Sequence, residues 1–296
     1  MFTRRHPYLF FILIFSAVVA TAMVVMTFFF TLGTSESEFD FGEKVGVIEV
    51  SGIIAESKSV LNQLKRFRED KSIKAIVVRI NSPGGAVGPS QEIFREIRRT
   101  SVVKKVVASM GTIAASGGYY IAAGANGIVA NPGTITGSIG VIMGFTNYQD
   151  LLHKIGLIPI VIKSGKYKDI GSPVRKMKPE EKKLLTDFAD KIHKQFIQAV
   201  IDGRKMDRKK VESLADGRIF TGQESKKLGL VDRLGNLEDA IEWAGRLGGI
   251  KGKISTVYAK EKKFSILKLL TDSSAHDLFN HFLDSRISAD YIYRPD

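Results

Sequence analysis

A serine enclosed by small residues is the feature of this sequence that points most directly to chemistry. Ser116 lies in the run Ser109-Met-Gly-Thr-Ile-Ala-Ala-Ser-Gly-Gly-Tyr-Tyr120, after an expected strand and near the start of an expected helix. Small neighbours let a substrate carbonyl approach the serine Oγ, and the amide of Gly117 must reach the oxyanion that develops. Ser116 is therefore a candidate nucleophile. The competing interpretation is a helix packed tightly through Ala and Gly, with Ser116 bonded back to its own helix.

A serine nucleophile needs a general base, and the histidines are poorly placed for that role. His6 precedes a long apolar segment, and His276 and His281 lie near the end of the chain. His153 and His193 fall on polar faces of expected helices. A lysine is the remaining choice, since serine/lysine pairs are a known variant of the catalytic triad.

Lys168 stands in a loop punctuated by glycine and proline, Ser164-Gly-Lys-Tyr-Lys-Asp-Ile-Gly-Ser-Pro173, after an expected strand over residues 158–162. A lysine base must be neutral, so burial or neighbouring cations must lower its pKa. Lys163 and Lys166 are candidates for such neighbours. The alternative is a solvated basic loop, and the local pattern alone does not choose Lys168.

Strands and helices alternate along the chain, which predicts an α/β fold. Glycine-containing turns follow two of the apolar runs, at residues 81–85 and 136–140, and each alone is typical of an ordinary turn. Expected strands are 45–50, 75–80, 106–109, 128–130 and 158–162; expected helices are 60–67, 89–99, 114–125, 148–154, 180–202, 207–215, 222–227 and 236–247, with an amphipathic segment over 264–282.

A long apolar segment near the N-terminus predicts a membrane anchor. Tyr8 to Leu32 contains 25 residues without a charge, and about 20 apolar residues suffice to cross a bilayer. Arg4 and Arg5 precede the segment, so the positive-inside rule places residues 1–7 in the cytoplasm and the remaining chain outside it. The alternative is a signal peptide that is cleaved after Ala22.

Composition narrows the class of protein further. The 296 residues carry a net charge of +13, and the absence of cysteine excludes disulfides, a thiol nucleophile and thiolate metal sites. No P-loop or dinucleotide-binding glycine motif occurs, and we expect no cofactor, no metal and no nucleic-acid partner. We expect an N-terminus and anchor over 1–33, a linker over 34–43, a catalytic domain over 44–247 and a C-terminal extension over 248–296.

Five motifs, in the same order, resemble those of the signal peptide peptidase A family, in its short single-copy form. The resemblance covers about residues 44 to 245 and implies a spiral of β-β-α units similar to Clp protease and crotonase. The motifs are Asn81-Ser-Pro-Gly-Gly, Met110-Gly-x-x-Ala-Ala-Ser-Gly-Gly-Tyr-Tyr, Thr136-Gly-Ser-Ile-Gly-Val-Ile, Ser164-Gly-x-Tyr-Lys-Asp-Ile-Gly-Ser-Pro and Gly217-Arg-Ile-Phe-Thr-Gly-x-x-Ser-Lys-Lys-Leu-Gly-Leu-Val-Asp232.

This resemblance implies a role for five residues. Ser116 would be the nucleophile and Lys168 the general base. Ser138 would hold the lysine amine by a hydrogen bond, and the amides of Gly85 and Gly117 would form the oxyanion hole. By likeness to half of the duplicated long form, the serine and the lysine would come from neighbouring protomers of a homo-oligomeric ring, and a single chain would be inactive.

The expected function is therefore a serine endopeptidase anchored in the bacterial inner (cytoplasmic) membrane by one span, with its catalytic domain outside the cytoplasm. Its expected substrates are cleaved signal peptides and other unfolded or apolar peptides. Two alternatives remain open at this point. One is a crotonase-like acyl-CoA enzyme of the same fold, and the other is a membrane scaffold that has no catalytic activity.

Overall fold

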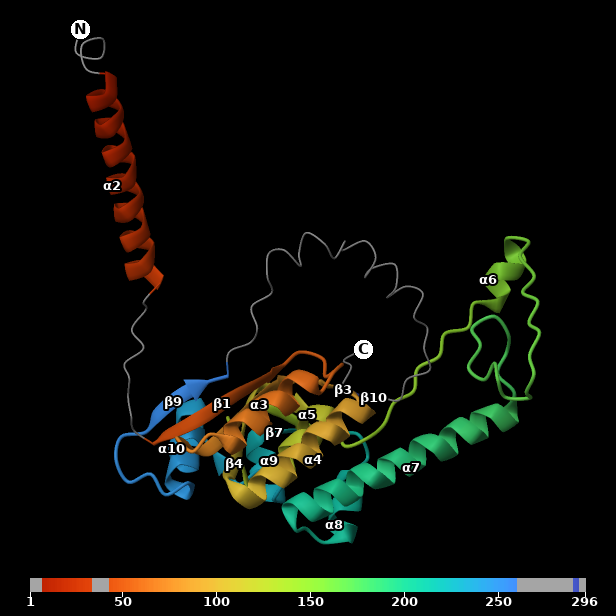
Figure 1. The fold of residues 1–296 in the computed structure, drawn as a ribbon. Helices are drawn as coiled ribbons and strands as arrows, with labels where there is room; N and C mark the ends of the chain where they lie inside the picture. The colour runs from red at the N-terminus through yellow and green to blue at the C-terminus, as the bar shows by residue number, and fades with distance from the viewer. Residues whose placement is uncertain (1–6, 34–42, 260–289, 293–296) are drawn as a thin grey trace. The chain divides into compact units, whose positions relative to one another are not determined.

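The computed structural model describes residues 7–33, 43–259 and 290–292 (Figure 1). The chain forms two units, Met1–Gly42 and Glu43–Asp296. In the first unit, helix α2 (Pro7–Gly33) is apolar and free of charge over Tyr8–Phe28. Its length and composition suffice to cross a membrane, although a signal sequence would pass the same test.

The second unit is built on an eight-stranded sheet with the order β7-β6-β4-β2-β1-β9, in which β5 pairs with β4 and with β8. Every pair is parallel except β6 with β7. The strands are β1 (Lys44–Ser51), β2 (Ile73–Ser82), β4 (Lys105–Ala115), β5 (Gly127–Ala130), β6 (Ile135–Gly137), β7 (Ile219–Thr221), β8 (Arg233–Leu234) and β9 (Ser255–Tyr258). This arrangement confirms the α/β prediction.

Helices cover both faces of the sheet because its central strands are apolar on both sides. In β1, Val45 and Val47 pack in the cluster that contains α10, whereas Ile48 and Val50 belong to the cluster with α3, α4 and α5. The helices are α3 (Lys58–Glu69), α4 (Val87–Val103), α5 (Gly117–Ala122), α6 (Gln149–Lys154), α7 (Pro179–Arg204), α8 (Arg208–Leu214), α9 (Gly222–Leu228) and α10 (Leu237–Leu247).

The described residues of the C-terminal extension contribute two strands. Strand β9 lengthens the main sheet beside β1. Strand β10 (Asp290–Ile292) pairs antiparallel with β3 (Gly84–Ala86) in a separate two-stranded sheet. Residues far apart in the sequence therefore meet beside the turn that follows β2.

Two expected elements differ from the structure. The expected strand over 158–162 is wrong, because that segment is irregular and its isoleucine and valine side chains are exposed, with Ile162 at 96%. The expected helix over 114–125 begins too early: Ala114 and Ala115 continue β4, where they pair with β6, and the helix starts only at Gly117. The amphipathic segment expected over 264–282 lies outside the described residues.

Candidate active site

Ser116 occupies a sharp turn between the end of β4 and the start of α5. Its φ of 50° lies in the left-handed region, which costs a non-glycine residue about 1–3 kcal/mol and is tolerated mainly at functional sites. The residue is 1% exposed, and its amide donates to the Gly137 carbonyl at 2.9 Å. The side chain forms no cap hydrogen bond with α5, contrary to the interpretation of Ser116 as a structural helix residue.

Ser138 lies at the same edge of the sheet as Ser116. Ala115 pairs with Gly137 in the parallel register of β4 and β6, so each serine directly follows one member of that pair. Ser138 also has a left-handed backbone, with φ of 49°, and its amide donates to the Arg218 carbonyl at 2.8 Å. The structure therefore brings these two predicted site residues together.

Gly85 and Gly117 also lie side by side. A Cβ atom added at Gly117 would stand 3.1 Å from the amide nitrogen of Gly85, and one added at Gly84 would stand 2.7 Å from the amide nitrogen of Gly117. A larger residue at Gly84 or Gly117 would therefore collide with main-chain atoms. Two backbone amides beside a buried serine are the donors that an oxyanion hole requires.

Lys168 lies in a different part of the domain, which we call the arm (residues 143–178, between β6 and α7). Its side chain is exposed, and its amide donates to the Gly165 carbonyl at 3.1 Å in a turn. In Figure 1 the arm, with α6, lies at the N-terminal end of α7, away from the sheet. Among the described residues, no hydrogen bond or ion pair joins the arm to the sheet, and none joins Lys168 to Ser116.

The other candidate groups fall elsewhere. Lys163 and Lys166, the candidate cationic neighbours of Lys168, form ion pairs with Asp169 and Glu180. His153 is exposed on α6, and in the described part of the chain His193 forms no hydrogen bond with Ser116. Across 7–33, 43–259 and 290–292, no three His, Asp or Glu side chains gather as a metal site would need.

Tyr291 is a site residue that the sequence analysis missed. It is fully buried, stacks on Tyr120 with ring centroids 5.0 Å apart, and lies 4.7 Å from the ring of Phe196. Its hydroxyl donates to the Ile192 carbonyl at 3.1 Å. Burial raises the pKa of Tyr291, and it raises that of Tyr120 to about 12, so both hydroxyls stay neutral. The alternating pattern Asp290-Tyr-Ile-Tyr was a weak signal of an edge strand.

Tyr291 also contacts the glycine pair. It is opposite Gly85 in the register of β10 and β3, and its carbonyl oxygen stands 2.9 Å from the position of a Cβ added at Gly117. A segment of the chain's own C-terminus therefore covers the two amides that neighbour Ser116.

Comparison with known proteins identifies the family. A model of Peptidase family S49 matches residues 98–251, and a model of Clp protease matches residues 45–134. The chain is 51% identical over 210 residues to a Synechocystis sp. protein named as a protease, covering 70% of this chain and 76% of the relative. It is 39% identical over 217 residues to an Enterococcus faecium protein named signal peptide peptidase SppA, covering 68% and 62%.

Protease 4 of Salmonella typhi is a longer relative, 34% identical over 244 residues that make up 79% of this chain and 39% of that protein. The Clp protease match agrees with the parallel sheet, and the named relatives confirm the resemblance to the signal peptide peptidase A family. On this evidence the chain is a protease and belongs to peptidase family S49.

Proposed function

We propose that the protein is a membrane-anchored serine endopeptidase that hydrolyses cleaved signal peptides with Ser116 as nucleophile and Lys168 as general base. The observation that carries this proposal is the turn at Ser116, where a buried serine with a left-handed backbone stands beside Gly117 and follows the same strand pair as Ser138. Such a turn presents Oγ to a bound carbonyl while the neighbouring amides face the developing charge.

The proposed reaction has two halves. The Ser116 Oγ attacks the scissile carbonyl while the neutral Lys168 amine takes its proton, and the Gly85 and Gly117 amides stabilise the oxyanion. The lysine then protonates the leaving amine, which gives an acyl-enzyme that water hydrolyses with the same base. Ser138 accepts or donates a hydrogen bond at the lysine amine and holds it toward Ser116.

Assembly into a homo-oligomeric ring would bring the lysine of one protomer to the serine of the next. Two features of the arm support this. Within the described residues, Lys168 has no hydrogen bond or ion pair with the sheet, and the apolar side chains of Ile158, Ile160 and Ile162 are between 76% and 96% exposed. Exposed apolar side chains of this kind are typical of an interface between subunits. One isolated chain would then be inactive.

Strand β10 supports a mode of substrate binding. Its antiparallel pairing with β3 supports a mode in which β3 accepts an extended segment as an added strand, with a side chain packed against Tyr120 and Phe196. A substrate peptide would displace β10 and occupy the same edge. Unfolded, apolar peptides suit such a site because their main chains are free and their side chains can replace the Tyr291 ring.

Location follows from α2 and the residues before it. We propose a single span in the bacterial inner (cytoplasmic) membrane with the catalytic domain outside the cytoplasm. Helix α2 is long enough to cross a bilayer, and Arg4 and Arg5 stand on its N-terminal side. Signal peptides left in that membrane would be close to the domain.

The test is hydrolysis of a signal-peptide substrate by Ser116→Ala and Lys168→Ala variants. Each should lose at least about 100-fold in kcat while secondary structure and native mass stay unchanged. Lys166→Ala is the matched control, because Lys166 is an exposed lysine of the same loop, and it should stay active. Either dyad variant keeping more than a tenth of the activity would reject the dyad. Hydrolysis of acyl-CoA in place of peptides would support the crotonase-like alternative. If the protein hydrolysed neither peptides nor acyl-CoA, the scaffold alternative would be supported.

A further inference from the structure

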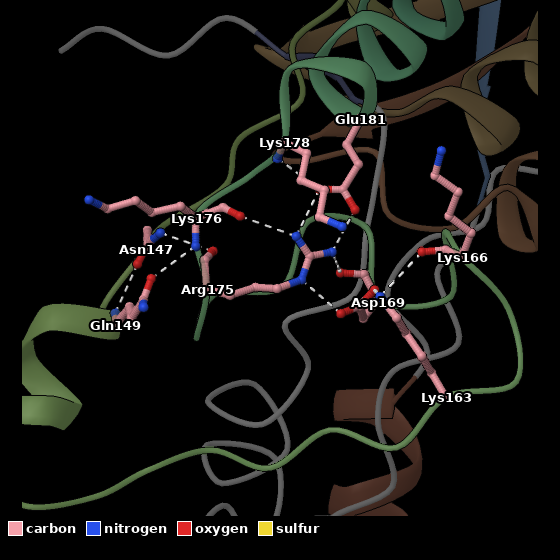
Figure 2. Close-up of polar contacts among 9 residues, drawn as sticks. All are labelled: Asn147, Gln149, Lys163, Lys166, Asp169, Arg175, Lys176, Lys178 and Glu181. Atoms are coloured by element: carbon pink, nitrogen blue, oxygen red, sulfur yellow. Dashed lines mark hydrogen bonds and ion pairs between the residues drawn. The ribbon is translucent and has the colours of Figure 1, made fainter.

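A cluster of charged side chains in the arm is centred on Arg175. Figure 2 shows its guanidinium between the carboxylates of Asp169 and Glu181. Nε donates to the Asp169 Oδ2 at 2.7 Å, and the two terminal nitrogens donate to Glu181 at 2.6 and 2.8 Å. Lys163 pairs with the other oxygen of Asp169. The cluster is largely shielded from solvent, since Glu181 is 1% exposed and the Asp169 side chain 12%.

This cluster joins the main chain beside Lys168 to a long helix. Asp169 directly follows Lys168, and Arg175 donates not only to its carboxylate but also to its carbonyl oxygen, at 3.0 Å. Glu181 lies in the first turn of α7, a helix of 26 residues, where it also accepts the Lys178 amide at 2.9 Å. Arg175 thus binds both Asp169 in the loop and Glu181 in the helix.

The same contacts occupy both carboxylates of the cluster. Hydrogen bonds from Arg175 and then Lys163 hold the pKa of Asp169 well below its usual range, and Arg175 lowers that of Glu181 to about 2. Both carboxylates are therefore ionised and paired at neutral pH. In the described chain Lys168 has no carboxylate partner, as a base that must become neutral requires.

We propose that Arg175 is a positioning residue for the reaction, which fixes Lys168 on α7 through Asp169 and Glu181. The inference rests on the proposed function, because it assigns Arg175 a role through the base. Precision is needed since a general base acts only within hydrogen-bond reach of its proton, and a displacement of about 1 Å can cost about 100-fold in rate. Among the described residues, the other ion pair between this loop and α7, Lys166 with Glu180, is exposed and would position Lys168 less precisely.

The experiment compares three variants of the full-length protein on the signal-peptide substrate. Arg175→Gln removes the connection and should lower kcat at least about tenfold with KM within twofold, while native mass and circular dichroism stay unchanged. Arg175→Lys keeps the charge but not the bidentate hydrogen bonding, and its kcat should fall between those of Arg175→Gln and the wild type. Lys183→Gln, which breaks the exposed Lys183–Asp187 pair on the same helix, is the matched control and should behave as wild type.

A double variant separates positioning from general structural support. If Arg175 acts only through the base, adding Arg175→Gln to Lys168→Ala should not lower the residual hydrolysis of an activated ester any further. A further loss in the double variant, loss of assembly in Arg175→Gln, or an unchanged kcat in Arg175→Gln would each overturn the inference. Failure of the proposed function looks different, because Lys168→Ala itself would then stay active.

Discussion

Tyr291 lies opposite Gly85 in the antiparallel register of β10 and β3, and its carbonyl oxygen reaches the backbone of Gly117. The C-terminal segment therefore covers the amides proposed as the oxyanion hole, in the manner of a bound peptide. Its aromatic ring is fully buried and packs against Tyr120 and Phe196.

Tyr291→Ala should weaken the pairing of β10 with β3 and so favour peptide hydrolysis. The substitution removes a fully buried ring and its hydrogen bond to the Ile192 carbonyl, and truncating a buried aromatic typically costs about 3–5 kcal/mol. A substrate that competes with β10 should then bind more readily. We expect KM for a signal-peptide substrate to fall at least about threefold, with kcat little changed.

Tyr258→Ala is the control for this prediction, because Tyr258 is a half-exposed tyrosine of the other C-terminal strand, β9. It should leave KM unchanged. An unchanged or higher KM in Tyr291→Ala, in a variant that folds and assembles normally, would show that β10 does not compete with substrate.

Mixed assemblies test whether the active site is shared between subunits. Ser116→Ala and Lys168→Ala subunits are unfolded together, reassembled and assayed on a signal-peptide substrate. Since each interface would combine one serine with one lysine, random pairing should restore up to about a quarter of the wild-type sites. A mixture that is verified as co-assembled by native mass, yet remains inactive, would place both residues of each site in one chain.

The ion pair of Glu181 with Arg175 predicts a pH-dependent contribution to stability. Arg175 lowers the pKa of Glu181 from its ordinary value of 4.5 to about 2, so the contribution is complete above about pH 5 and is lost as the pH falls toward 2. We expect the difference in Tm between wild type and Glu181→Gln to be largest near pH 6 and to shrink between pH 5 and 2.

Glu212→Gln is the control variant for this pH dependence, because the ion pair of Glu212 with Arg208 is long and exposed. Its Tm should track that of wild type across the same range. A difference between wild type and Glu181→Gln that does not change with pH would mean that the ion pair with Arg175 is not its source.

The central strands of the sheet could be predicted from the sequence, because apolar runs identify β1, β2, β4 and β5. The adjacency of Ser116 and Ser138 could not, because residues 114–125 have the pattern of one helix and β6, whose pairing with β4 brings the two serines together, is only three residues long. The glycines at 84, 85 and 117 indicate turns in the sequence, and the structure adds that a side chain at any of these positions would meet main-chain atoms.

The contacts of the arm and of the C-terminus could not be predicted. Residues 158–162 have the apolar pattern of a buried strand, yet Ile160 and Ile162 are exposed in one chain. The apolar pattern indicates that these side chains favour burial, but it does not identify the surface that buries them. Arg175 binds carboxylates six residues away on either side, a spacing that differs from the i,i+3 and i,i+4 pairs of a helix. The pairing of Tyr291 with Gly85 joins distant parts of the sequence through three residues, too few for a periodic signal.

Labelling with a serine-directed phosphonate, followed by mass mapping of the adduct, tests the dyad most directly. A peptidyl phosphonate should form one adduct per chain, on the peptide that contains Ser116, because only an activated serine attacks phosphorus at a useful rate. The adduct should be absent in Ser116→Ala and should form at least about 100-fold more slowly in Lys168→Ala. An adduct on another residue, or undiminished labelling of Lys168→Ala, would contradict the assignment of nucleophile and base.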